Sequence, residues 1–140
     1  MNRRYCIVGI GGFGRETLTC LVDSMNAKNE NPKSRIVFMV DDEFYKVPIL
    51  KGYEVIPTSK FNSEKYEVVI GIGDPLKRRK VVESLPVETV YGNIIHPTVV
   101  ISEWVEISEG TIITAGCVLT CDIKIGKHAH FNLLSTVGHD

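Results

Sequence analysis

The sequence predicts a chain of two parts: an α/β, Rossmann-like unit over residues 1–95 and a parallel β-helix over residues 96–140. In the first part, short continuous apolar runs alternate with amphipathic segments, a pattern typical of a parallel sheet covered by helices on both faces. In the second part, a bulky apolar residue recurs at every sixth position, which is typical of a β-helix built from hexapeptide repeats. The dipeptide His96-Pro97 marks the predicted boundary.

Apolar runs in the first part predict strands, because a strand that is buried on both faces shows no polar alternation. The predicted strands are residues 5–9, 36–40, 67–72 and 87–95, and residues 47–57 predict a loop with one further short strand. Helices are predicted over residues 15–26, where apolar residues recur at helical spacing, and over residues 75–84, which begin with a proline. Residues 58–65 predict a single helical turn.

The second part has a strict period of six. The bulky apolar residues at this period are Ile101, Ile107, Ile113, Leu119, Ile125, Phe131 and Val137. Neither an α-helix nor one flat strand produces this period, whereas a hexapeptide can supply one flat side of a coil. The residues two positions earlier are mostly small or β-branched, such as Thr111, Cys117 and Ala129. We therefore expect stacked bulky side chains inside the coil and smaller ones at its corners.

A glycine-rich turn joins the first predicted strand to the first predicted helix. It reads Gly9, Ile10, Gly11, Gly12, Phe13, Gly14 and matches the pattern G-x-G-x-x-G in its strand–turn–helix context. The first glycine permits a tight turn, the second lets a phosphate approach the backbone, and the third lets the helix pack on the strand. Free N–H groups at the helix start attract a diphosphate. The alternative is a glycine-rich turn without a ligand.

Two further segments end predicted strands at the same edge of the sheet. Asp41 and Asp42 follow the second strand, where a carboxylate can accept a hydrogen bond from a ribose or sugar hydroxyl. The turn 71–74, which contains Gly73, follows another strand at the edge where open α/β sheets bind ligands. The alternative for each is a simple strand-ending turn. The basic segment 77–80 predicts a solvated helix face, with a phosphate contact as the alternative.

Among the four histidines, His139 is the candidate for chemistry. An imidazole has a pKa near neutrality and can act as a general base. The adjacent Asp140 can orient the imidazole and stabilise its cationic form. His96, His128 and His130 are interpreted as structural.

Composition gives no sign of several kinds of partner. The net charge is −1 and no apolar run approaches the roughly 18 residues of a membrane span, so neither nucleic acid nor a membrane is expected as a partner. The four cysteines complete no zinc pattern, so no metal is expected. Cysteines that act as small, reduced hydrophobes favour a cytoplasmic location.

The order of these motifs resembles one family. The segments GIGGFGRE, VDD, IGIGD, IIHPTVVIS and STVGHD follow one another as they do in bacterial nucleotide-sugar acetyltransferases with hexapeptide repeats. These include the bacillosamine-pathway UDP-4-amino-sugar N-acetyltransferases, the perosamine N-acetyltransferases and the sialic acid O-acetyltransferases. The resemblance covers essentially the whole chain. It implies a left-handed β-helix, a homotrimer, and acetyl transfer from acetyl-CoA to an amino group of a UDP-, GDP- or dTDP-linked sugar in glycan biosynthesis.

The resemblance also implies roles for residues of this chain. His139 matches the catalytic base, and Asp140 matches the acid that raises its basicity. The residues that match the nucleotide-sugar site are Gly11, Gly12, Phe13, Asp41, Asp42 and Gly73, and Gly9 and Gly14 complete the glycine turn.

In one respect the chain departs from the family pattern. The β-helix of the family continues for several more coils, which hold most of the acetyl-CoA site between neighbouring subunits, whereas this sequence stops at Asp140. We expect the chain to be a fragment or a truncated form that binds a nucleotide sugar but not acetyl-CoA, and that trimerises weakly. The alternatives are a sugar O-acetyltransferase, an NAD-binding oxidoreductase or nucleotide-sensing module, and a non-catalytic scaffold.

Overall fold

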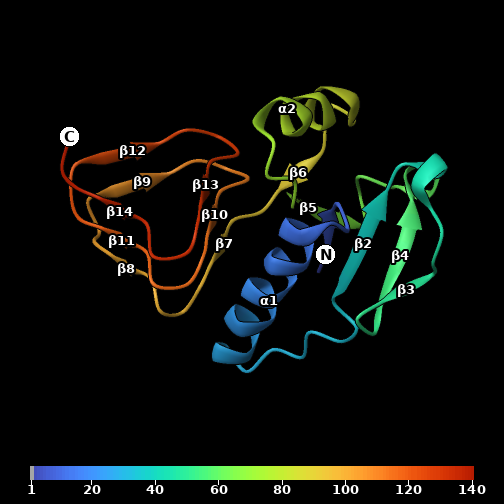
Figure 1. Ribbon diagram of the computed structural model, residues 1–140, viewed down its shortest axis with the longest axis horizontal. Helices are drawn as coiled ribbons and strands as arrows, with labels where there is room; N and C mark the ends of the chain where they lie inside the picture. Colours follow the sequence, from blue (N-terminus) through green and yellow to red (C-terminus); the bar gives the residue numbers. More distant parts are fainter. Residues whose placement is uncertain (1) are drawn as a thin grey trace.

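A computed structural model of the chain describes residues 2–140 and consists of two parts that lie side by side (Figure 1). The first part is a six-stranded sheet in the order β3-β4-β2-β1-β5-β6. Its strands are β1 (Arg4–Val8), β2 (Ile36–Val40), β3 (Ile49–Leu50), β4 (Tyr53–Pro57), β5 (Tyr66–Ile70) and β6 (Val90–Tyr91). The helices are α1 (Gly12–Ala27) and α2 (Pro75–Ser84), with short 3-10 turns η1 (Asp42–Phe44) and η2 (Thr58–Lys60). Neighbouring strands are parallel, except that β3 is antiparallel to β4.

The central strand of the sheet contributes to two separate cores. Ile7 of β1 lies in one cluster with Leu21 of α1, whereas the next residue back, Cys6, lies in a second cluster against Val81 of α2. Both strand residues are fully buried. Successive side chains of a strand point to opposite faces, so a strand covered on both sides is apolar throughout. The predicted Rossmann-like α/β unit is therefore confirmed.

The second part is a coil of very short parallel strands. They are β7 (Ile94–Ile95), β8 (Val100–Ile101), β9 (Val105–Ile107), β10 (Ile112–Ile113), β11 (Val118–Leu119), β12 (Ile123–Ile125), β13 (His130–Phe131) and β14 (Thr136–Val137). They form three sheets, in the orders β13-β10-β7, β14-β11-β8 and β12-β9. Each sheet pairs a residue with the one three hexapeptides further along, so that Ile113 lies between Ile95 and Phe131. The repeat is therefore a parallel β-helix, as the period of six predicted.

The corners of the coil follow the same period. The residues with positive φ in successive hexapeptides are Gly110, Gly116, Asp122, His128, Leu134 and Asp140, with φ between 56° and 77°. Each lies three positions after a stacked apolar residue. Glycine adopts this left-handed conformation freely and other residues only at some cost. The left-handed residue lies directly before the smaller residue that was expected at the corner, as Gly116 lies before Cys117. The sequence does not reveal this left-handed position, because four residue types share it.

Two predicted elements differ from the structure. Residues 87–95 do not form one strand: β6 pairs with β5, and after Gly92 the chain enters β7, which pairs with β10. Ile94 and Ile95, which the sequence analysis assigned to the first part, thus hydrogen-bond within the β-helix. An apolar run reports burial but not the sheet to which a strand belongs. The segment 47–57 contains the antiparallel hairpin of β3 and β4 rather than one short strand.

Helix α1 packs between the two parts (Figure 1). Ile94 and Ile112 of the β-helix belong to the same buried cluster as Leu21 of α1. The two parts therefore share a hydrophobic core. Within residues 2–140, no helix is long and apolar enough to cross a membrane.

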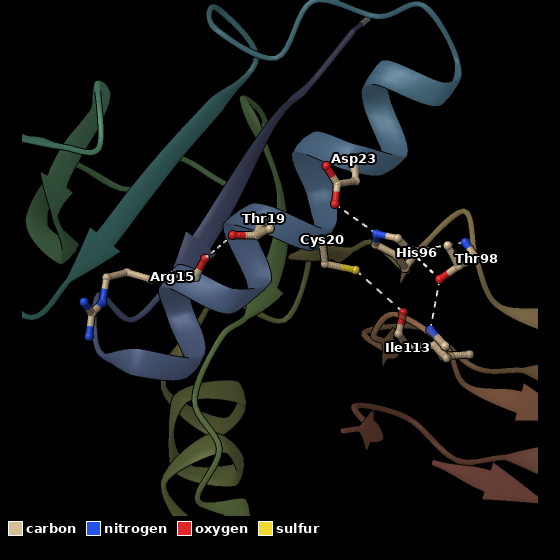
Figure 2. Close-up of polar contacts among 8 residues, drawn as sticks. Arg15, Thr19, Cys20, Asp23, His96, Thr98 and Ile113 are labelled. Carbon is tan, nitrogen blue, oxygen red and sulfur yellow. Dashed lines mark hydrogen bonds and ion pairs between the residues drawn. The ribbon is translucent and has the colours of Figure 1, made fainter. Parts of the chain in front are cut away.

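Polar contacts accompany this shared core (Figure 2). The thiol of Cys20 lies 3.6 Å from the carbonyl oxygen of Ile113, and His96 Nε2 lies 2.9 Å from Asp23 Oδ2. His96 Nδ1 also lies 2.7 Å from Thr98 Oγ1. Nε2 of His96 therefore connects the first coil to α1, and Nδ1 fixes the ring within that coil, which supports the structural interpretation of this histidine.

Candidate functional site

A groove of about 480 Å³ opens at the carboxyl ends of β1 and β2, beside α2. It is lined by Val8, Gly9, Ile10, Met39, Val40, Asp41, Phe44, Ile72, Lys77, Lys80 and Val81. Its walls are mostly apolar, with one carboxylate and two ammonium groups among them. Open α/β sheets bind ligands at this edge, and such sites combine apolar walls with a few polar groups.

The three glycines of the motif differ in what the fold requires of them. Gly9 has a φ of +102°, and a Cβ there would lie 3.0 Å from the carbonyl oxygen of Gly71. A Cβ on Gly14 would overlap the carbonyl group of Gly9. Gly11, in contrast, has a φ of −72° and open space where its Cβ would lie. The fold therefore requires Gly9 and Gly14, whereas at Gly11 the missing side chain leaves room beside the start of α1.

The start of α1 leaves its first backbone N–H groups without a side-chain acceptor. Gly11 is the N-cap residue, and in the described chain no side chain caps this helix. The N–H groups of Gly12 and Phe13 lie in the first turn, where a helix offers them no internal acceptor. Such groups, together with the helix dipole, favour a phosphate.

The two predicted acids have different environments. Asp41 lines the groove, and its Oδ1 accepts a hydrogen bond of 3.3 Å from Thr58 Oγ1. Asp42 Oδ1 accepts a 2.9 Å hydrogen bond from the backbone N–H of Ser59. The backbone and side-chain hydrogen bonds from Ser59 lower the pKa of Asp42. Because Asp41 lines the groove, its carboxylate is available to a ligand. Asp42 does not line the groove, and its carboxylate stabilises the start of η2.

The turn after β5 lies beside the glycine motif. A Cβ on Gly73 would lie 4.0 Å from Phe13 Cβ, so the two turns are neighbours, although neither residue lines the groove itself. Asp74 caps α2, because its Oδ1 accepts hydrogen bonds from the backbone N–H groups of Leu76 at 2.8 Å and Lys77 at 3.1 Å. These hydrogen bonds, that of Lys77 first, lower the pKa of Asp74.

The basic residues of α2 are exposed as a solvated helix face predicts, except for Arg78, which is half-buried. Lys77 and Lys80 line the groove, and Arg79 is exposed. Arg78 turns inward, and its Nη1 donates a 2.8 Å hydrogen bond to the carbonyl oxygen of Ile72. Lys77 and Lys80 are the site residues to which the sequence analysis gave too little weight. Their i, i+3 spacing at the start of a helix that follows a sheet edge was the available signal.

The candidate base lies elsewhere. His139 Nδ1 is 3.0 Å from Asp140 Oδ2, and both side chains are largely exposed, at 77% and 82%. They follow β14, and the C-terminus lies at the side of the β-helix that is remote from the α/β sheet (Figure 1). Neither residue lines the groove. The structure therefore pairs His139 with Asp140 but does not bring this pair to the glycine turn of the same chain.

Fold and groove together define a class of protein: a Rossmann-like unit with a ligand groove at its carboxyl edge, fused to a parallel β-helix. The chain belongs to the family described as the PglD N-terminal domain, whose model matches residues 4–85.

Relatives of known identity extend this likeness into the β-helix. A GDP-perosamine N-acetyltransferase of Escherichia coli O157:H7 is 30% identical over 140 residues, which is 97% of this chain and 62% of that enzyme. The acetyltransferase domain of PglB from Neisseria gonorrhoeae FA1090, solved with acetyl coenzyme A, superposes with a TM-score of 0.79 at 24% identity, over 100% of this chain and 66% of that one. PerB from Caulobacter crescentus, solved with CoA and GDP-perosamine, superposes with a TM-score of 0.77 at 24% identity, over 98% of this chain and 63% of that one. The chain thus spans about two thirds of the length of these relatives.

Proposed function

We propose that this chain holds the nucleotide-sugar site and the catalytic base of an acetyltransferase that acetylates an amino group of a nucleotide-linked sugar. The observation that carries the proposal is the groove beside the uncapped start of α1, with Asp41 on one wall and Lys77 and Lys80 on another. The family and the acetyltransferase relatives supply the reaction class. The donor is acetyl-CoA, as in the PglB domain solved with it.

Each part of the groove suits one part of a nucleotide sugar. The N–H groups at the start of α1 and the ammonium groups of Lys77 and Lys80 suit a diphosphate. The carboxylate of Asp41 suits a ribose or sugar hydroxyl. The apolar wall, which includes Phe44, suits the face of a base. Glycine at position 11 then keeps the backbone open to the phosphates.

His139 is the proposed general base. When its Nδ1–H donates to Asp140, its Nε2 is left as a proton acceptor. We expect Nε2 to remove a proton from the sugar amine as the amine attacks the thioester carbonyl, with the carboxylate of Asp140 stabilising the imidazolium that forms. The new C–N bond replaces the C–S bond of the thioester, and the CoA thiolate leaves and takes up the proton from the imidazolium.

Because His139 and the groove lie on different sides of one chain, the proposal includes a homotrimer in which His139 serves a sugar held by a neighbouring copy. Large apolar side chains of the β-helix support such association. Val100, Trp104, Leu133 and Leu134 are exposed at 63%, 64%, 55% and 77%. Large apolar side chains that a fold leaves exposed are a common component of interfaces between chains. The four cysteines are free thiols, which suits the proposed cytoplasmic location.

Calorimetry of the chain with GDP-, UDP- and dTDP-linked sugars, NAD and free acetyl-CoA tests the binding part of this proposal. We expect one class of nucleotide sugar to bind with a micromolar dissociation constant and NAD to bind far more weakly. Tight binding of NAD without binding of any nucleotide sugar would contradict the proposal and favour a nucleotide-sensing module.

Mixed oligomers of the full-length gene product test the shared site. A Gly11→Val copy lacks the sugar site and a His139→Ala copy lacks the base. If one copy serves its neighbour, mixing the two inactive variants restores part of the acetyl transfer to an amino sugar. Absence of any recovery in confirmed mixed oligomers would place base and sugar site in the same copy. Transfer to a hydroxyl but not to an amine would identify an O-acetyltransferase.

A further inference from the structure

One histidine of the β-helix contacts the glycine turn directly and the turn after β5 through Arg78. The ring of His130, on β13, stacks on the ring of Phe13 in the glycine turn, with centroids 4.8 Å apart and planes inclined by 23°. Its Nδ1 lies 3.0 Å from Nη1 of Arg78 on α2. His130 thus joins three segments that are remote in sequence.

Arg78 transmits this contact to the second turn. Its Nη1 also lies 2.8 Å from the carbonyl oxygen of Ile72 and 3.3 Å from that of Gly73. A guanidinium only donates, so His130 Nδ1 must be the acceptor and the imidazole is neutral, with its proton on Nε2. Burial, and then the charge of Arg78, lower the pKa of His130 to about 4, which agrees with a neutral ring at physiological pH.

These contacts restrain the residues that shape the groove. Phe13 follows Gly12 in the first turn of α1, whose N–H groups have no side-chain cap. Ile72, whose carbonyl binds Arg78, lines the groove directly. Without His130, the Phe13 ring loses its stacking partner and Arg78 loses an acceptor, so both turns gain freedom.

We propose that His130 is a positioning residue: from the β-helix it holds both turns of the groove in the geometry that accepts a diphosphate. The identity of the ligand rests on the proposed function, whereas the restraint on the two turns does not. Nucleotide-sugar affinity therefore depends on a side chain outside the α/β unit, although every residue that lines the groove lies within that unit.

A second contact between the two parts provides a control that distinguishes a positioning role from general packing. His96 also joins the β-helix to the α/β unit, through Asp23 in α1, but it does not line the groove (Figure 2). His96→Ala is therefore the matched control for His130→Ala. Both variants remove a half-buried histidine between the two parts, but only His130 contacts the turns beside the groove.

The first measurement is the dissociation constant of the nucleotide sugar that binds the wild-type chain. We expect His130→Ala to weaken binding by about tenfold and His96→Ala to leave it within about twofold. Arg78→Gln should add little to His130→Ala, because the two side chains act through one contact. His130→Phe keeps the stacking but removes the acceptor, and His130→Gln keeps an acceptor; both should bind with intermediate affinity.

The second measurement is amide hydrogen exchange of the ligand-free chain, which does not depend on the ligand. Exchange over residues 11–14 and 71–74 should accelerate in His130→Ala and His130→Phe but not in His96→Ala. Unchanged exchange and affinity in folded His130 variants would overturn the positioning role. Accelerated exchange in a chain that binds no nucleotide sugar would uphold the restraint and refute the proposed function.

Discussion

The two parts of the chain use parallel strands in opposite ways. In the α/β part, five-residue strands such as β1 and β5 are buried on both faces and end together at one edge. In the β-helix, strands are only two or three residues long, and most hexapeptides place one bulky residue and the residue two positions before it in the interior. Aligned strand ends gather backbone and side-chain groups from remote segments into one groove, whereas a coil presents its polar groups singly at its corners.

This difference explains where the candidate functional groups lie. The glycine turn and Asp41 meet at one groove because β1 and β2 are neighbours in the sheet. The pair of His139 and Asp140 lies at a corner position of the coil and is exposed. The α/β part is therefore suited to binding, whereas the exposed pair of His139 and Asp140 needs a second surface to enclose it.

Replacing the proposed base, His139, should lower turnover and leave nucleotide-sugar binding unchanged. His139→Ala in the full-length protein should lower kcat by about 10²–10⁴-fold, the usual contribution of a general base, with little change in nucleotide-sugar affinity. Asp140→Asn should lower kcat less, because it removes only the orienting charge. Steady-state kinetics and calorimetry check both. Wild-type turnover in a correctly folded His139→Ala protein would exclude His139 as the base.

A substitution in the glycine turn should instead weaken nucleotide-sugar binding. Gly11→Val should weaken nucleotide-sugar binding by more than about tenfold, because its side chain fills the space beside the start of α1. The melting temperature should stay unchanged, since that space is open and φ is ordinary. Gly126→Val in the β-helix, which also points into open space, is the control and should change neither quantity. Full affinity in Gly11→Val would place the diphosphate elsewhere.

The contact between the two parts should make stability depend on pH. The pKa of His130 is lowered to about 4 in the folded chain, by burial and then by Arg78 and His128. The unfolded chain therefore binds more protons between about pH 4 and 6.5. The stability contribution is complete above pH 6.5 and is lost as the pH falls toward 4, by about 2 kcal/mol after allowance for solvent screening.

Urea unfolding at pH 7 and at pH 4.5 measures this loss. His130→Phe should remove much of the difference between the two pH values, whereas His96→Ala should retain it. Burial also lowers the pKa of His128, so a smaller dependence should remain in His130→Phe. An equal pH dependence in wild type and His130→Phe would contradict the assignment.

The smallest effect concerns the N-terminal cap of α2, which the side chain of Asp74 provides within the α/β part. Asp74→Ala removes the acceptor of two backbone N–H groups at the start of α2 and should lower the melting temperature by about 2–4 °C. Asp74→Asn keeps a capping oxygen and should lower it less. Differential scanning calorimetry checks both variants, and a melting temperature unaffected by the alanine would show that solvent replaces the cap.

The parts of the fold that follow from local periodicity were predictable. The strand over residues 36–40 and the helix over residues 75–84 have the predicted bounds, because an apolar run and an N-terminal proline act within a few residues. The split of residues 87–95 between two sheets was not predictable, because Tyr91 and Ile94 are both apolar and differ only in the partner strand. The corner role of Leu134 was not predictable either, because four residue types share that position. Its φ of 61° is unusual for a leucine.

Local patterns in the sequence were enough to predict the class of each part and the turn that begins the groove. A period of six, a strand-length apolar run and a G-x-G-x-x-G turn are local patterns, since burial and backbone conformation depend on near neighbours in sequence. Three features depend on tertiary packing: Lys80 lines the groove, Asp42 accepts a hydrogen bond from Ser59, and His130 contacts Phe13 and Arg78. Those roles depend on which remote segments pack together, and packing is decided by the shape and burial of the whole chain.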